Sequence, residues 1–205
     1  MYEYYRTLND SLQRVAYYKD IDALSGKASS FAIANEYDKI LAAIGARYTN
    51  AYTTEDATVY LNDIPTNQLE NFIRLEANRF KKIVPRLFHT ELEAVYEEKN
   101  RSLDNDYWKS AETMSAALFS AHPYGTQTVI GTIDHLKNPS ISEIKKYFNT
   151  YYRPNNVAIC MSGDLDYDKT IALIDKHFSA WESNPDLPVW NKIEEAPIQQ
   201  PVVRE

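Results

Sequence analysis

Two glutamates, Glu91 and Glu98, are the residues whose type and spacing best fit a chemical role. They are seven residues apart in the segment 85–105, and seven residues come close to two turns of an α-helix. A helix here would carry both carboxylates on one line. Its buried stripe would consist of Phe88, Leu92 and Val95. Paired acids can do chemistry, but a solvated acidic face is the interpretation that this segment favours by itself.

The histidines do not complete a metal site in this sequence. They are His89, His122, His135 and His177. No two of them are three or four residues apart, so no helix presents two imidazoles to one metal ion. We expect His135 and His177 to be surface residues or structural residues with satisfied hydrogen bonds.

The single cysteine, Cys160, excludes an intrachain disulfide and a zinc site built from several thiolates. Its apolar neighbours predict a small buried side chain. The five glycines are isolated, so the sequence has no phosphate-binding loop, and no serine lies in a nucleophile elbow.

Length and composition describe one ordinary globular domain. The chain has 205 residues, of which 44% are hydrophobic and 25% are charged. Its net charge is −7 and it has no long basic run, so we expect no nucleic-acid partner. No apolar stretch is long enough to span a membrane, and the first twenty residues are too polar for a signal peptide.

Apolar periodicity predicts two helices before the first strand. Apolar residues keep helical spacing over 4–16, which predicts a helix already under way at the start, and we expect native sequence to precede Met1. A second helix is expected over 27–44, with Phe31 near its apolar face and Gly45 at its C-terminal end.

A hairpin and a strongly amphipathic helix follow. Strands over 47–53 and 57–61 are rich in Tyr, Thr and Val and are separated by three polar residues. The helix begins at Pro65 and Thr66 and ends before Pro85.

Two further helices are expected in the middle of the second half. The first covers 107–121 and ends at the loop 122–125. The second begins at Ser140, where Glu143 completes a capping box. The inward residues of the first are predicted to be Met114, Ala117, Leu118 and Ala121.

A helix–strand–helix unit is expected at the end of the domain. The strand is the apolar run 157–161, and prolines among polar residues make 182–205 an exposed linker to a further domain. Because helices outnumber short strands, the fold class is α+β, an antiparallel sheet with helices on one face. The stripe of the last helix is Tyr167, Ile171, Ile174, Phe178 and Trp181.

Several segments carry recognisable residues in a fixed order. They are 45–53 (GARYTNAYT), 58–60 (TVY), 95–98 (VYEE), 122–125 (HPYG) with 130–132 (IGT), and 151–156 (YYRPNN) with 162–164 (SGD). Together they resemble the pitrilysin/insulinase family of zinc peptidases, the inverzincins, over roughly residues 32–181. The resemblance implies a processing-peptidase type of metalloprotease fold, truncated at its N-terminus. Residues 1–181 would form a single peptidase-type domain, with 1–26 as a helical insertion.

The resemblance also implies roles for particular residues. Glu98 matches the glutamate that binds zinc on the later helix, and Glu91 matches an acid that orients or electrostatically supports the site. The edge strand that receives an extended peptide by strand addition is matched by Asn50, Ala51, Tyr52 and Thr53. Glu91 as a plain surface acid and Asn50 as a strand-end residue remain alternatives.

The departure from the family is that H-x-x-E-H does not occur in this sequence. We expect it upstream of Met1, so this chain alone would lack two zinc ligands and the general base, would be inactive and would not bind zinc tightly. In the leading interpretation, the chain is part of the N-terminal catalytic domain of a zinc metalloendopeptidase. That enzyme would hydrolyse peptides bound as an extended strand and would have a homologous second domain. The alternative is a non-catalytic homologue that binds a substrate or partner. A periplasmic or cell-envelope location is compatible with the resemblance.

Overall fold

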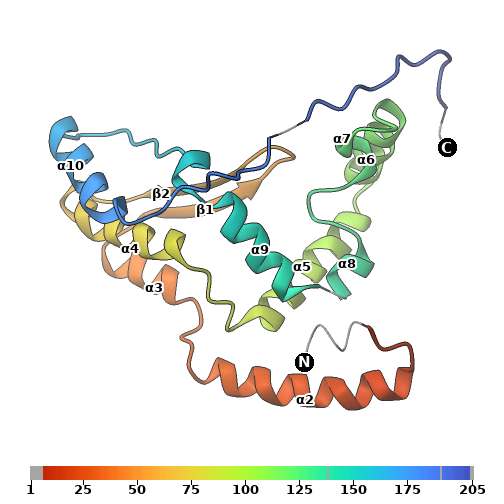
Figure 1. The fold of residues 1–205 in the computed structure, drawn as a ribbon, viewed down its shortest axis with the longest axis horizontal. Helices are drawn as coiled ribbons and strands as arrows, with labels where there is room; N and C mark the ends of the chain where they lie inside the picture. The colour runs from red at the N-terminus through yellow and green to blue at the C-terminus, as the bar shows by residue number, and fades with distance from the viewer. Residues whose placement is uncertain (1–6, 138, 190, 204–205) are drawn as a thin grey trace. The chain divides into compact units, whose positions relative to one another are not determined.

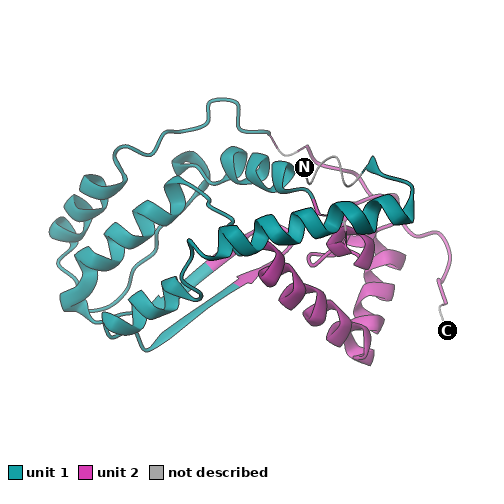
Figure 2. Cartoon of the chain, turned by 90° about the horizontal axis from the view of Figure 1, so that it is seen from below, with its two compact units in different colours: residues 1–51, 60–87, 140–188 teal, residues 52–59, 88–139, 189–205 magenta. Residues whose placement is uncertain are grey.

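The computed structural model describes residues 7–137, 139–189 and 191–203 (Figure 1). Those residues form helices and one two-stranded sheet, which confirms the α+β class. The chain divides into two compact units (Figure 2). Unit 1 comprises residues 1–51, 60–87 and 140–188, and unit 2 comprises residues 52–59, 88–139 and 189–205.

Helix α2 (Ser11–Ser29) opens the described part of unit 1. The helix predicted over 4–16 therefore begins only at Ser11, since residues 8–10 are not helical, and its residues 4–6 lie outside the described residues. Asp10 caps it, because Asp10 Oδ1 accepts hydrogen bonds from the amides of Leu12 (2.8 Å) and Gln13 (3.0 Å). Ile21 is its buried residue.

The helix predicted over 27–44 is divided, and this prediction was wrong in its continuity. Helix α2 ends at Ser29, and α3 (Glu36–Ala43) begins after Asn35, whose φ of 53° is left-handed. Asparagine tolerates this conformation, which interrupts a right-handed helix. Phe31 therefore lies between the helices and is 78% exposed instead of lying on a buried face.

Gly45 ends α3 as predicted. Its φ is 85°, its amide donates to the Ala42 carbonyl (3.0 Å), and the Ala46 amide donates to the Leu41 carbonyl (2.9 Å). These two bonds form a Schellman motif, which turns the chain towards the first strand.

The hairpin is confirmed as strands β1 (Tyr48–Thr53) and β2 (Thr58–Asp63), which pair with each other. The Thr54 amide donates to the Ala57 carbonyl (2.8 Å) across the turn. Every residue of β1 is exposed. Within the described residues β1 therefore has one paired edge and one open edge.

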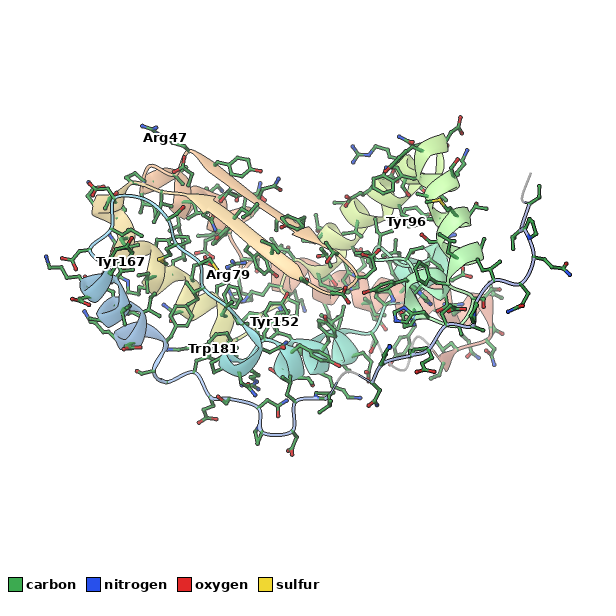
Figure 3. The ribbon with its side chains drawn as sticks, turned by 90° about the horizontal axis from the view of Figure 1, so that it is seen from above. Arg47, Arg79, Tyr96, Tyr152, Tyr167 and Trp181 are labelled. Carbon is green, nitrogen blue, oxygen red and sulfur yellow. The ribbon has the colours of Figure 1, made fainter. Side chains whose placement is uncertain are left out.

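The apolar core of unit 1 lies around helix α4 (Leu69–Lys81), which follows the short helix η1 (Thr66–Gln68). Helix α4 packs on α10 (Tyr167–Phe178). The Phe80 ring lies 5.5 to 5.9 Å from those of Tyr60, Tyr152 and Trp181. Figure 3 shows Tyr152 and Trp181 in this region. The buried apolar residues of the unit are Ile21, Leu41, Ile73, Ala77 and Trp181.

Helix α9 (Ile141–Tyr151) starts as predicted, because Ser140 Oγ accepts a hydrogen bond from the Glu143 amide (3.1 Å). Helix η2 (Pro154–Asn156) follows. The strand predicted over 157–161 was wrong. Val157 is extended, but no described strand pairs with this segment, and an extended chain becomes a strand only with a ladder partner. Cys160 is consequently exposed and not buried.

Helix α10 forms as predicted, but its stripe is buried only in part. Trp181 is 8% exposed, whereas Tyr167 is 79% and Ile171 57% exposed. Tyr167 lies at the outer end of α10 (Figure 3). The packing against α4 covers the second half of the stripe and leaves the first turn in solvent.

Unit 2 contains α5 (Phe88–Leu103), α6 (Asp106–Leu118), α7 (Pro123–Thr126) and α8 (Ile133–Lys137). Helix α7 occupies the predicted loop 122–125, and α8 was not anticipated from the sequence. The buried side chains that the structure describes here are polar, Lys99 and His122.

The apolar faces predicted for α5 and α6 are covered only in part. Val95 is 36% exposed and Met114 is 60% exposed, and Leu118 is exposed as well. Phe88 and Leu92 are half-buried. The spacing of the apolar residues is helical, but the described elements of unit 2 cover these faces only in part. No described helix is long and apolar enough to cross a membrane.

Candidate functional site

Helix α5 carries the two predicted acids on one face. It runs without interruption from Phe88 to Leu103, so Glu91 and Glu98 are two turns apart, about 10 Å along the axis. Both side chains are exposed. Glu91 lies in the first turn, where a carboxylate also stabilises the helix through its dipole. Glu91 therefore has a structural reason to be acidic that requires no metal.

An ion pair next to Glu98 holds α5 against α6. Lys99 Nζ lies 3.1 Å from Glu112 Oε1, and Lys99 is only 5% exposed. Ser102 Oγ donates to the Lys99 carbonyl (2.7 Å). Sequence reasoning missed Lys99, although a lone lysine among Glu91, Glu93, Glu97 and Glu98 was a signal that could have found it.

Strand β1 places the predicted peptide-binding residues in sequence along one exposed strand. The amide of Ala51 donates to Asn50 Oδ1 (2.9 Å), and Asn50 Nδ2 donates to the Tyr48 hydroxyl (2.9 Å). Thr53 Oγ1 lies 3.4 Å from Thr58 Oγ1 on β2. Tyr52 is 51% exposed. An amide held by an adjacent side chain is a donor that an added strand can take over.

The donors of this chain do not by themselves fit a zinc ion. Structural and catalytic zinc sites use at least three protein ligands. Among residues 7–137, 139–189 and 191–203, no group of three His, Cys, Asp or Glu side chains is arranged to hold a metal. Glu98 is one exposed carboxylate on a rigid helix and offers at most one ligand.

The histidines have structural contacts. His122 Nδ1 accepts from the Tyr124 amide (3.2 Å), and His135 Nδ1 accepts from the Thr132 amide (3.4 Å). His177 Nε2 lies 3.2 Å from Glu70 Oε1. The expectation that His135 and His177 are surface residues or structural residues with satisfied hydrogen bonds is confirmed.

Glu70 joins α4 to α10 on the surface of unit 1. Its Oε1 accepts a hydrogen bond from Lys176 Nζ (2.6 Å) and also contacts His177. These bonds, from Lys176 first and His177 second, lower the pKa of Glu70.

A buried polar network that sequence reasoning missed surrounds Arg79 in unit 1. The Arg79 guanidinium lies 4.6 Å from the centre of the Tyr37 ring and 4.5 Å from that of Tyr60. Glu76 is 9% exposed and accepts hydrogen bonds from Arg79 and from the Tyr37 hydroxyl (2.8 Å). Figure 3 shows Arg79 in the middle of this unit, near Tyr152.

The network changes the titration of two tyrosines. Burial, followed by the nearby Glu76 carboxylate, raises the pKa of Tyr37 to about 12. Burial also raises the pKa of Tyr60, whose hydroxyl shares a 2.7 Å hydrogen bond with that of Tyr152. These groups are part of the core, and none of them was a predicted site residue.

Two surface pockets lie in unit 1. One has a volume of about 360 Å³, beside Arg79, and an aromatic lining from Tyr60, Tyr147, Phe148 and Tyr152. Another, about 700 Å³, lies between α9 and residues 182–185 and is lined mostly by residues with polar side chains. Neither contains a predicted site residue.

Comparisons with known proteins identify relatives for most of the chain. Residues 140–205 match the family described as Peptidase M16 inactive domain. The zinc protease PqqE of Helicobacter pylori is 29% identical over 167 residues, which cover 78% of this chain and 36% of that protein. The insulin-degrading enzyme of Mus musculus is 29% identical over 182 residues, 83% of this chain and 17% of that enzyme.

Solved structures have the same fold. A protease from Helicobacter pylori superposes with a TM-score of 0.69 at 27% identity, covering 75% of this chain and 38% of that one. The first half of the periplasmic protease PqqL from Escherichia coli superposes with a TM-score of 0.61 at 22% identity, covering 73% of this chain and 33% of that one. The chain thus spans just over a third of its Helicobacter relative.

Proposed function

This chain belongs to the pitrilysin/insulinase family, and we propose from that premise that it forms part of the N-terminal catalytic domain of a zinc-dependent metalloendopeptidase. The observation that carries the proposal is the similarity to the Helicobacter pylori proteases. It extends over about three quarters of the chain both in sequence and in fold.

Glu98 is the residue of this chain that we assign to the metal. It is exposed on an uninterrupted helix and next to the buried Lys99, which fixes the helix in place. Glu91 supports the site from the same face. The other ligands and the general base belong to H-x-x-E-H, which this sequence does not contain, so the isolated chain is inactive.

The peptide is bound in this proposal along the open edge of β1. Main-chain hydrogen bonds from residues 50–53 hold an extended substrate whatever its sequence, and the exposed Tyr52 side chain contacts it. The bond between the Ala51 amide and Asn50 Oδ1 supports this role, because it keeps the edge donor satisfied until a substrate strand replaces it. A homologous second peptidase-type domain is the expected partner.

The proposal is tested on the complete gene product that contains this chain. Glu98→Gln is expected to lower the amount of bound zinc and to reduce peptidase activity by more than about a hundredfold. Mutation of a residue that only hydrogen-bonds to a metal ligand already lowers metal affinity or activity by about 10–100-fold. The matched control is Glu97→Gln, because Glu97 is the neighbouring exposed acid on α5. Full zinc content and full activity in Glu98→Gln would refute the assignment.

A second candidate function is a non-catalytic binding module. The match of residues 140–205 to a family described as an inactive domain favours it. In that case the gene product binds an extended peptide without hydrolysing it, and zinc content is unrelated to peptide affinity. The two candidates are distinguished by titrating the gene product with one extended peptide, with and without zinc, under conditions that prevent turnover. A peptide affinity that does not depend on zinc favours the binding module.

A further inference from the structure

Glu195 is held by a dense set of hydrogen bonds in unit 2. Its Oε1 accepts from the Ser120 amide (2.9 Å) and the Ser120 hydroxyl (2.7 Å). Its Oε2 accepts from the amides of Ala121 (2.9 Å) and His122 (2.8 Å), and the Ala121 amide also reaches Oε1 (3.2 Å). Both carboxylate oxygens are therefore bound by donors from three consecutive residues.

The donors form a backbone concavity of the kind that binds anions. The amides of 120–122 follow α6 and precede the first helical residue of α7, so the site is a turn between the helices. Consecutive amides that point to one side create a positive potential without a charged residue. The Ser120 hydroxyl adds a side-chain donor. Such a site recognises a carboxylate by its shape and hydrogen-bonding capacity.

The chain around Glu195 has little other structure. The described residues 191–203 contain neither helix nor strand, and all of them except the half-buried Glu195 are exposed. Among the described residues 191–199, Glu195 makes the hydrogen bonds to the rest of unit 2. The side chain of Gln199 donates a hydrogen bond to the nearby carbonyl of Pro197. One carboxylate therefore carries the polar attachment of this segment.

We infer that the Ser120–His122 turn is a carboxylate-binding site, that Glu195 is its occupant, and that this contact docks residues 191–199 on unit 2. The ligand class is a single carboxylate on an extended chain. The sequence alone described this segment as an exposed linker. The inference is independent of any peptidase activity.

Limited proteolysis of the full chain tests the docking. Trypsin cleaves after Lys192, which is exposed, and must bind several residues on each side in an extended form, including position 195. Cleavage therefore requires Glu195 to leave the turn. Glu195→Gln is expected to accelerate this cleavage about tenfold, which corresponds to about 1.4 kcal/mol. Ser120→Ala, which removes one donor, is expected to accelerate it less.

Two controls make the test specific. Glu194→Gln makes the same chemical change at the adjacent exposed residue and is expected to leave the cleavage rate unchanged. Free peptides of residues 188–199, with glutamate or glutamine at position 195, measure the intrinsic preference of trypsin, by which the rates are corrected. Equal corrected rates for the wild type and Glu195→Gln would overturn the docking.

Binding in trans tests the site itself. The wild-type peptide 188–199 is added to the Glu195→Gln chain, and the amide resonances of 120–122 are followed by NMR. Saturable shifts are expected with this peptide, but not with the peptide that has glutamine at position 195. Smaller shifts are expected in the wild-type chain, because its own Glu195 competes. Absence of any difference between the two peptides would overturn the carboxylate site.

Discussion

Replacement of Glu76 by glutamine is expected to destabilise unit 1 more than any other single loss of charge in the Arg79 network. Glu76 is 9% exposed and receives hydrogen bonds from both Arg79 and Tyr37. The side chain of Arg79 is 29% exposed and lies over three aromatic rings. Glu76→Gln leaves this guanidinium largely buried without a counter-charge.

The magnitude follows from the burial of the pair. Removing one partner of a fully buried ion pair costs about 3–5 kcal/mol. The remaining exposure of Arg79 and its contact with the rings reduce this figure, and glutamine keeps one acceptor oxygen. We expect the free energy of unfolding to fall by about 2–3 kcal/mol, which lowers the melting temperature of a chain of this size by roughly 5–10 °C.

The assay is chemical denaturation at neutral pH, with a double-mutant cycle. Glu76→Gln is expected to be much less harmful in an Arg79→Met background, with a coupling energy of about 2 kcal/mol. Glu143→Gln is the control, because Glu143 and Lys146 form an exposed pair, and a change below about 0.5 kcal/mol is expected. If Glu76→Gln lowered the free energy of unfolding by less than about 1 kcal/mol, and the effects of Glu76→Gln and Arg79→Met were additive, the aromatic rings and not Glu76 would hold Arg79 in place.

Two further predictions concern packing and pH. Gly125→Ala is expected to destabilise the chain by about 1–3 kcal/mol, because the new Cβ would meet the carbonyl oxygens of Phe119 and Ser115 (2.5 Å for the latter). Gly26→Ala should stabilise the chain by about 1 kcal/mol, because Gly26 lies within α2 and a Cβ there would meet no neighbouring atom. A higher melting temperature for Gly125→Ala than for Gly26→Ala would contradict this. The pKa of Tyr37 is raised on folding, so its contribution to stability is complete below about pH 10 and is lost as the pH rises to about 12. Tyr37→Phe should make the fall in stability over this interval shallower, and an unchanged slope in denaturation at several pH values would exclude the buried phenol as its cause.

Local signals in the sequence predicted the elements that they determine. Gly45 marks the end of α3 because a positive φ favours glycine, and Ser140 with Glu143 marks the start of α9 because its hydroxyl satisfies a helical amide. The hairpin followed from two β-rich runs around a polar turn. Each of these signals lies within a few residues of the structure that it specifies.

Burial and long-range contacts could not be predicted in the same way. The run 157–161 has the composition of a strand, but a strand requires a partner that composition does not reveal. Val95 and Lys99 lie one turn apart on the same side of α5, yet only Lys99 is buried, because the contact with Glu112 of α6 is made at its turn of the helix. The site around Glu195 is formed by backbone amides, which every sequence possesses. For the candidate site, the sequence predicted the shared face of Glu91 and Glu98, and their chemistry stays a prediction.

The ion pair between Lys99 of α5 and Glu112 of α6 means that the direction in which the Glu98 side chain points depends on both helices. A helix is a stiff rod, so a contact at one residue fixes the rotation of all its neighbours about the axis. A turn of about 10° moves an atom about 6 Å from the axis by about 1 Å. Misplacement on that scale can cost a reaction about a hundredfold. Substitutions at Glu112, which lies on α6, can therefore change the position of the Glu98 carboxylate although Glu112 makes no direct contact with it.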